Sequence, residues 1–111
     1  MKTYKPYLDW IETQQQEMLD LLYRWGNQNT FSYNLPGLSQ FLITLKSAFA
    51  GLQGTIQELS LTPQTKRNSK GTPETVELGK ALSIVKRPNA KLKLFLGGHM
   101  DTVYSDRKSV V

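Results

Sequence analysis

The sequence predicts an α/β protein. Two apolar patterns with helical spacing occupy its first half, and three short segments typical of strands occupy its second half. The 111 residues suffice for one domain at most, and their composition, 39% hydrophobic and 21% charged, is that of ordinary globular protein. Because cysteine is absent from the sequence, any metal would need nitrogen or oxygen ligands.

Two helices are predicted in the first half. The first covers residues 6–25, because apolar residues recur there at steps of three, four and seven, Pro6 suits a first helical turn and Gly26 is a stop signal. Turn-forming residues follow at 27–37. The second helix ends near Gly51 or Gly54. Its apolar face consists of Leu38, Phe41, Leu42, Leu45, Phe49 and Leu52.

Three strands are predicted in the second half. The first covers residues 55–61, and residues 62–75 form a mobile loop rich in Thr, Lys, Pro, Asn and Gly. The second strand covers residues 81–85 and is followed by a turn at residues 87–90. The third, residues 91–96, changes from alternation to a continuous apolar run, which is typical of a strand entering the middle of a covered sheet.

The last predicted strand leads into the segment GGHMDTVY, residues 97–104, which contains His99, the only histidine of the chain. In extended backbone, His99 and Asp101 point to the same side. An imidazole that binds zinc through one nitrogen needs an acceptor for its other N–H, and Asp101 is placed to provide it. For the triplet alone, the favoured interpretation is a histidine at a strand end that hydrogen-bonds to Asp101 and has no other role.

The whole string is more specific than the triplet. It resembles the first motif of the co-catalytic zinc hydrolases, the family of acetylornithine deacetylase, succinyl-diaminopimelate desuccinylase, the aminoacylases, tripeptidase and glutamate carboxypeptidase. That motif is a hydrophobic strand followed by His-x-Asp-Thr-Val, here residues 99–103. The preceding Gly-Gly and the following Tyr104 are most similar to the glutamate-carboxypeptidase-like hydrolases. The order of helices, loop and strands extends the resemblance to most of residues 1–105, but only the His-x-Asp-Thr-Val stretch is specific.

The resemblance implies that residues 1–105 are the amino-terminal part of a truncated zinc exopeptidase catalytic domain with a mixed sheet. It implies that His99 ligates one of two zinc ions and that Asp101 is the catalytic-site aspartate that orients His99. The complete protein would hydrolyse amide bonds of N-acyl amino acids or carboxy-terminal peptide bonds, in a small-molecule or peptide substrate, and homodimerisation stays open. In the family the other ligands and the glutamate general base follow this motif, so the fragment alone is expected to be inactive.

The final residues and the net charge leave alternatives open. Residues 106–111 resemble one translated frame of a sequencing adapter and are expected to be a non-native tail; a native polar tail is the alternative.

A small non-catalytic α/β binding module and a basic nucleic-acid binder are the rival functions, the latter because the net charge is +5. The basic residues do not alternate with aromatic ones, so no nucleic-acid partner is expected. No membrane span or signal peptide is recognised, so a cytoplasmic location is expected.

Overall fold

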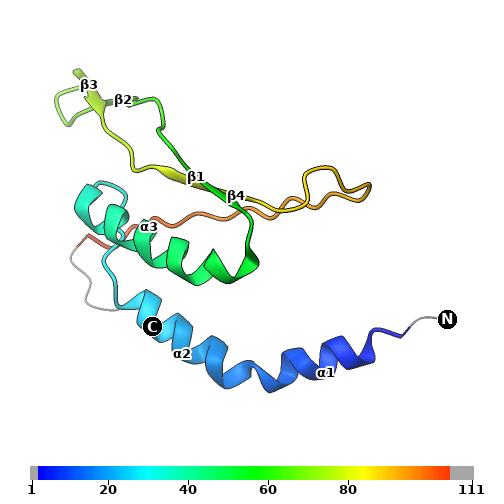
Figure 1. The fold of residues 1–111 in the computed structure, drawn as a ribbon. Coiled ribbons are helices and arrows are strands. Elements are labelled where there is room, and N and C mark those ends of the chain that lie inside the picture. The colour runs from blue at the N-terminus through cyan, green and yellow to red at the C-terminus, as the bar shows by residue number, and fades with distance from the viewer. Residues whose placement is uncertain (1–2, 106–111) are drawn as a thin grey trace.

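The computed structural model describes residues 3–105, so the predicted tail at 106–111 lies outside the described residues. The α/β class is confirmed in its general form. Within the described residues, three α-helices precede two small antiparallel sheets of two strands each (Figure 1). The radius of gyration is 18.0 Å, compared with about 13 Å for a compact domain of this length. The described chain is thus extended, and many of its large apolar side chains are exposed.

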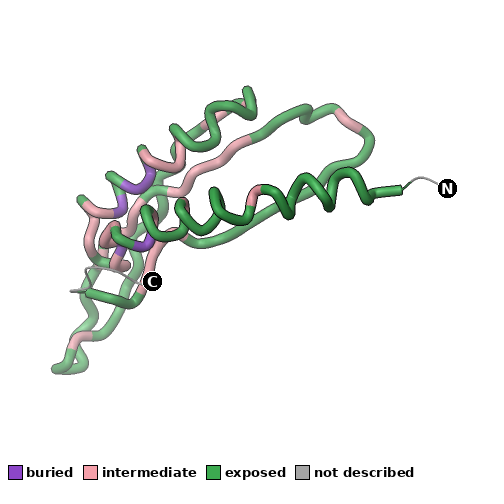
Figure 2. Tube along the Cα trace, turned by 90° about the horizontal axis from the view of Figure 1, so that it is seen from below, coloured by how far each residue is buried: buried purple, intermediate pink, exposed green. Residues whose placement is uncertain are grey.

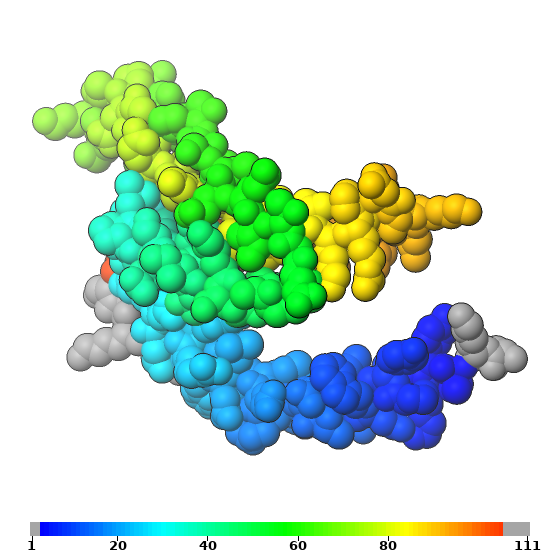
Figure 3. Space-filling model, viewed as in Figure 1, coloured from blue at the N-terminus to red at the C-terminus, as the bar shows by residue number. Residues whose placement is uncertain are grey.

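The first predicted helix is two helices, α1 (Lys5–Thr13) and α2 (Gln15–Gly26), and the expectation of one continuous helix over residues 6–25 was wrong. Gln14 separates them, with φ −93° and ψ 2°. Beside this break the Thr13 hydroxyl donates to the Trp10 carbonyl oxygen at 2.5 Å, and side-chain bonds to the preceding turn often accompany bends in helices. Figure 3 shows α1 and the start of α2 standing clear of the rest of the molecule.

Helix α3 (Leu35–Phe49) carries the core and continues as a short 3₁₀ turn, η1 (Ala50–Leu52). The predicted second helix and its end are therefore confirmed. The buried hydrophobic residues of the described chain are Leu38, Phe41 and Leu42. The rings of Trp25, at the end of α2, and Phe41 meet edge to face at a centroid distance of 5.6 Å. Figure 2 shows that burial is concentrated in α3 and the residues just before it.

The strands form two separate antiparallel pairs. β1 (Thr55–Leu59) pairs with β4 (Ala81–Val85), which confirms the strand at 81–85 and most of the strand at 55–61. The expected loop at 62–75 is instead a hairpin of β2 (Gln64–Arg67) and β3 (Pro73–Val76). Asn68 closes its turn, because its side-chain oxygen accepts hydrogen bonds from the backbone N–H groups of Lys70 and Thr72.

The prediction of a strand at residues 91–96 was wrong: within the described chain this segment is not part of any sheet. The turn at 87–90 is present, with the Ala90 N–H donating to the Arg87 carbonyl oxygen at 3.1 Å, and the chain then runs back towards α3 without pairing to a strand (Figure 1). Apolar alternation predicts a strand only where a neighbouring backbone completes the ladder. The apolar side chains of this segment are 80–92% exposed. They are Leu92, Leu94, Phe95 and Leu96.

Candidate metal-binding site

The GGHMDTVY segment lies against the loop that joins α2 to α3. Thr102 donates its backbone N–H to the Thr30 carbonyl oxygen at 2.8 Å, and its own carbonyl accepts the Ser32 N–H at 3.1 Å. The two bonds form an isolated parallel bridge between Phe31 and Thr102. Thr30 is buried at this contact. The motif is thus held by residues about 70 positions earlier in the chain.

Two asparagines give this loop its shape. The Asn34 side-chain amide donates to the Asn29 side-chain oxygen at 3.1 Å and lies 3.3 Å from the Asn29 carbonyl oxygen. The Asn34 side-chain oxygen accepts the Gly37 N–H and so caps α3. Asn29 also donates to the Ser105 carbonyl oxygen at 3.1 Å, beyond the motif. The loop is therefore tied both to α3 and to the segment it holds.

His99 and Asp101 contact each other, as their spacing predicts. Nδ1 of His99 lies 3.2 Å from Oδ1 of Asp101 and 2.8 Å from the Asp101 carbonyl oxygen. Both neighbours are acceptors, so the neutral ring carries its proton on Nδ1 and leaves the Nε2 lone pair available. The His99 side chain is 83% exposed. This is the arrangement of a histidine ligand with a carboxylate behind it.

Ser32 completes the arrangement, and sequence reasoning missed it. Its hydroxyl donates to Oδ2 of Asp101 at 2.6 Å. That bond lowers the pKa of the Asp101 carboxyl below its usual range; partial burial acts in the opposite direction, and the charge of a protonated His99 adds to the lowering. No spacing rule connects a loop serine with a motif 69 residues later, so the sequence alone contained no signal for this contact.

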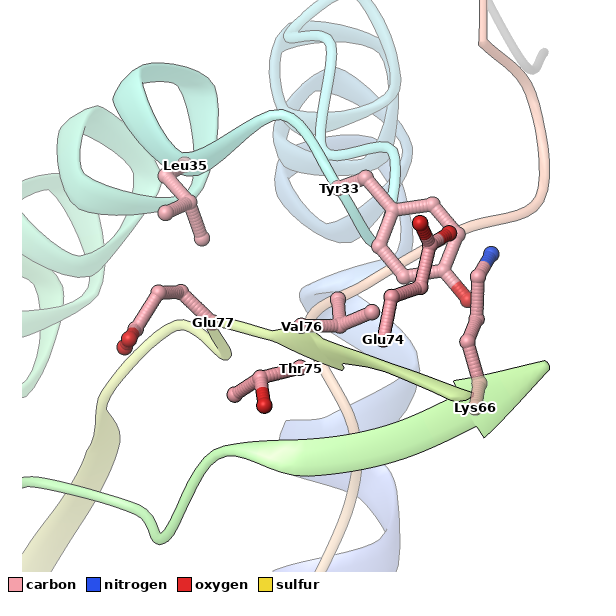
Figure 4. Close-up of a pocket in the computed structure, with 7 residues that line it drawn as sticks. All are labelled: Tyr33, Leu35, Lys66, Glu74, Thr75, Val76 and Glu77. Atoms are coloured by element: carbon pink, nitrogen blue, oxygen red, sulfur yellow. The ribbon is translucent and has the colours of Figure 1, made fainter. Parts of the chain in front are cut away.

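Two hollows flank the loop on the surface. One, of about 270 Å³, lies directly at the candidate site. Its lining consists of Ser32, His99, Asp101, Thr102, Val103 and Tyr104. The other, of about 400 Å³, opens between the β2–β3 hairpin and the start of α3 (Figure 4). There the Lys66 ammonium lies 4.2 Å from the centre of the Tyr33 ring, as a cation–π contact.

The described residues fit one part of a zinc site. His99 offers a nitrogen ligand with an oriented partner, but within residues 3–105 no three His, Asp or Glu side chains gather as a metal-binding group. A zinc site needs three or four protein ligands. Any further ligands would therefore have to come from outside the described residues.

Comparisons of the chain with protein-family models, curated proteins and solved structures find no match. The resemblance to the co-catalytic zinc hydrolases therefore stays a hypothesis that depends on the motif and on the geometry around His99. None of the described helices is long and apolar enough to cross a membrane.

Proposed function

We propose that residues 1–105 are the amino-terminal part of a zinc-dependent amidohydrolase or exopeptidase, in which His99 is a metal ligand and Asp101 holds it in position. One observation carries this proposal above all. The carboxylate and carbonyl oxygens of Asp101 both face Nδ1 of His99, so the neutral imidazole carries its proton on Nδ1. The lone pair on Nε2 is then free to bind a metal ion.

The chemical role of each residue follows from this contact. The carbonyl and carboxylate oxygens of Asp101, 2.8 and 3.2 Å from Nδ1, together select the tautomer of His99 and restrict rotation of the ring. The hollow beside the pair gives a substrate group access to the exposed ring. The chemistry that zinc supplies when bound is polarisation of an amide carbonyl and activation of water near neutral pH.

The exposed run at 92–96 supports the same proposal. In a zinc hydrolase domain of the α/β class, a strand that leads to a ligand residue lies within the sheet and is covered on both faces. Residues 92–96 have the composition of such a strand but lack a ladder partner within the described chain. The proposed complete domain would supply neighbouring strands, and the finer fold, a mixed-sheet exopeptidase domain, belongs to this proposal.

The substrate class rests on the motif alone. Its resemblance to the co-catalytic zinc hydrolases favours an amide bond in an N-acyl amino acid or at the carboxyl end of a peptide. Such substrates are small molecules or short peptides, and no nucleic acid is part of the proposed reaction.

The experiment starts from the protein that the complete reading frame encodes. We expect the purified protein to contain zinc, to release amino acids from N-acyl amino acids or carboxy-terminal peptides, and to lose activity on treatment with a chelator. Activity should return with added zinc. His99→Ala should lose metal and activity together, whereas a substitution of the exposed Ser39 should change neither. A wild-type protein that binds no zinc, or that keeps its activity after His99→Ala, would show the proposal to be wrong.

A further inference from the structure

We propose that Ser32 is a positioning residue of this site, and that it sets the orientation of His99 through Asp101. The inference rests on the proposed function, because it assigns a role to Ser32 in the same metal site. Its structural basis is one continuous chain of contacts, from the Ser32 hydroxyl to Oδ2 of Asp101 and from Oδ1 of Asp101 to Nδ1 of His99.

The two oxygens of the Asp101 carboxylate have different partners. Oδ2 accepts from Ser32 at 2.6 Å, and Oδ1 lies 3.2 Å from the His99 ring. A carboxylate held at only one oxygen can still rotate about its Cβ–Cγ bond. Once Ser32 holds Oδ2, the rotation that would turn Oδ1 away from the imidazole also breaks a short, charge-assisted hydrogen bond. Ser32 thus favours the carboxylate orientation that holds His99.

Ser32 is itself fixed by backbone contacts. Its N–H donates to the Thr102 carbonyl oxygen at 3.1 Å, on the residue immediately after Asp101. The asparagine pair, Asn29 and Asn34, holds the loop on either side. The hydroxyl is therefore presented from a backbone that is bonded both to the motif and, on either side, to the asparagine pair.

Two other roles for the Ser32 hydroxyl are less consistent with the distances. The hydroxyl also lies 3.2 Å from the Thr102 carbonyl oxygen, but it has one proton, and the carboxylate is the closer and charged acceptor. A serine nucleophile would donate to an imidazole that acts as its base. Here the serine donates to the carboxylate instead, at the oxygen that does not face His99.

The test uses four variants of the protein that the complete reading frame encodes. Ser32→Ala removes the donor, and Ser32→Thr keeps a hydroxyl. Ser32→Cys keeps the size of the side chain but offers only a weak donor. Ser39→Ala removes an exposed serine of α3 and serves as the control. Two properties are measured: zinc affinity, by competition with a chromogenic chelator, and the His99 tautomer in the metal-free protein. The tautomer is read from imidazole ¹⁵N shifts, assigned by comparison with His99→Ala.

We expect Ser32→Ala to weaken zinc binding about tenfold, the lower end of the range for residues behind a ligand. The His99 ring should lose part of its preference for the Nδ1–H tautomer, because the Asp101 carboxylate is then free to rotate away and only the Asp101 carbonyl oxygen, 2.8 Å from Nδ1, remains as a fixed acceptor. Ser32→Thr should restore both properties, and Ser39→Ala should match the wild type. If Ser32→Ala does not fold, Ser32→Cys decides the question, because it should show the same losses in a side chain of similar size.

The outcomes separate the two proposals. If the wild type binds zinc and hydrolyses amides but Ser32→Ala and Ser32→Cys keep its zinc affinity and tautomer, the role of Ser32 is wrong and the proposed function stands. If the wild type binds no zinc, the proposed function is wrong. The tautomer of the metal-free protein then still decides whether Ser32 orients His99 through Asp101.

Discussion

The Ser32 hydroxyl oxygen lies 2.6 Å from Oδ2 of Asp101, although 69 residues separate the two in the chain. This contact joins the loop before α3 to the segment that carries His99. The isolated bridge between Phe31 and Thr102 runs through the same region. The loop and the motif therefore form one structural unit, and a change that opens the loop should also disturb the candidate site.

Gly37→Ala should open that loop. A Cβ at position 37 would overlap the Asn29 carbonyl oxygen and the Asn34 side chain, which together hold the turn. Over-packing of this kind typically costs about 1–3 kcal/mol in the free energy of unfolding. Gly51→Ala is the matched control, because a Cβ there would meet nothing within 4 Å. Urea unfolding of both variants checks the prediction; equal stability of the two would contradict it.

Leu42→Ala should destabilise the protein far more than Ile43→Ala. The two residues are adjacent in α3, but Leu42 is 3% exposed and Ile43 is 59% exposed. Removal of a buried leucine side chain costs about 2–5 kcal/mol, whereas an exposed substitution usually changes stability by about 0.5 kcal/mol or less. Thermal and urea unfolding give the difference. If the two variants unfold alike, the core does not lie on this face of α3.

The spacing of residues along the sequence predicted those elements whose stabilising contacts come from side chains on one face of a single helix or strand. The spacing of Leu38, Phe41 and Leu42 predicted α3, because these residues pack together on one side of the helix. The two-residue spacing of His99 and Asp101 likewise placed both side chains on one side.

Prediction from the sequence failed where the structure depends on a single side-chain contact that leaves no repeating pattern of apolar residues. The break at Gln14 lies beside a single side-chain bond, that of the Thr13 hydroxyl, and the β2–β3 hairpin is closed by the side chain of Asn68. Three of the four β3 residues and all of β2 are exposed, so the hairpin has no apolar alternation to recognise. The contact of Ser32 with Asp101 arises only when the chain folds back on itself.

His99→Ala and Asp101→Asn should differ in the protein that the complete reading frame encodes. His99→Ala removes a proposed ligand, so one zinc equivalent and most of the activity should be lost. Asp101→Asn removes only the charge behind that ligand, and we expect about 10–100-fold loss of activity with more of the metal retained. Asp9→Asn, in an exposed pair with Lys5, is the control. Zinc analysis and steady-state kinetics on the three variants test this; full activity of His99→Ala would show the ligand assignment to be wrong.

Nucleic acid should bind only weakly, despite the net charge of +5. Two basic side chains of the hairpin have local partners: Lys66 lies over the Tyr33 ring, and the Arg67 guanidinium donates to the Gly71 carbonyl oxygen at 2.6 Å. We expect no binding beyond nonspecific attraction. Titration of single- and double-stranded DNA at two salt concentrations checks this. Tight binding with a steep salt dependence, equivalent to several released counterions, would instead support a nucleic-acid binder.

The 111-residue chain, expressed alone, should associate through residues 92–96. Phe95 and Leu96 are each 92% exposed, and the backbone beside them is not paired in a ladder within the described chain. An extended apolar segment with free backbone donors and acceptors is a template for pairing with another copy. Leu94→Lys combined with Leu96→Lys should oppose this pairing, because lysine on an unpaired strand repels a second copy.

Sedimentation velocity at two protein concentrations measures this association. We expect the unmodified chain to shift towards larger species as concentration rises, and the double lysine variant to shift much less. Ile43→Lys is the matched control: it also adds a charge at an exposed apolar position, but on α3 and away from the extended segment. If Ile43→Lys suppressed association as well as the double variant does, added charge would be the cause. A wild-type chain that stays monomeric and melts cooperatively would show that residues 92–96 need no covering strand, and would remove one support for the proposed larger domain.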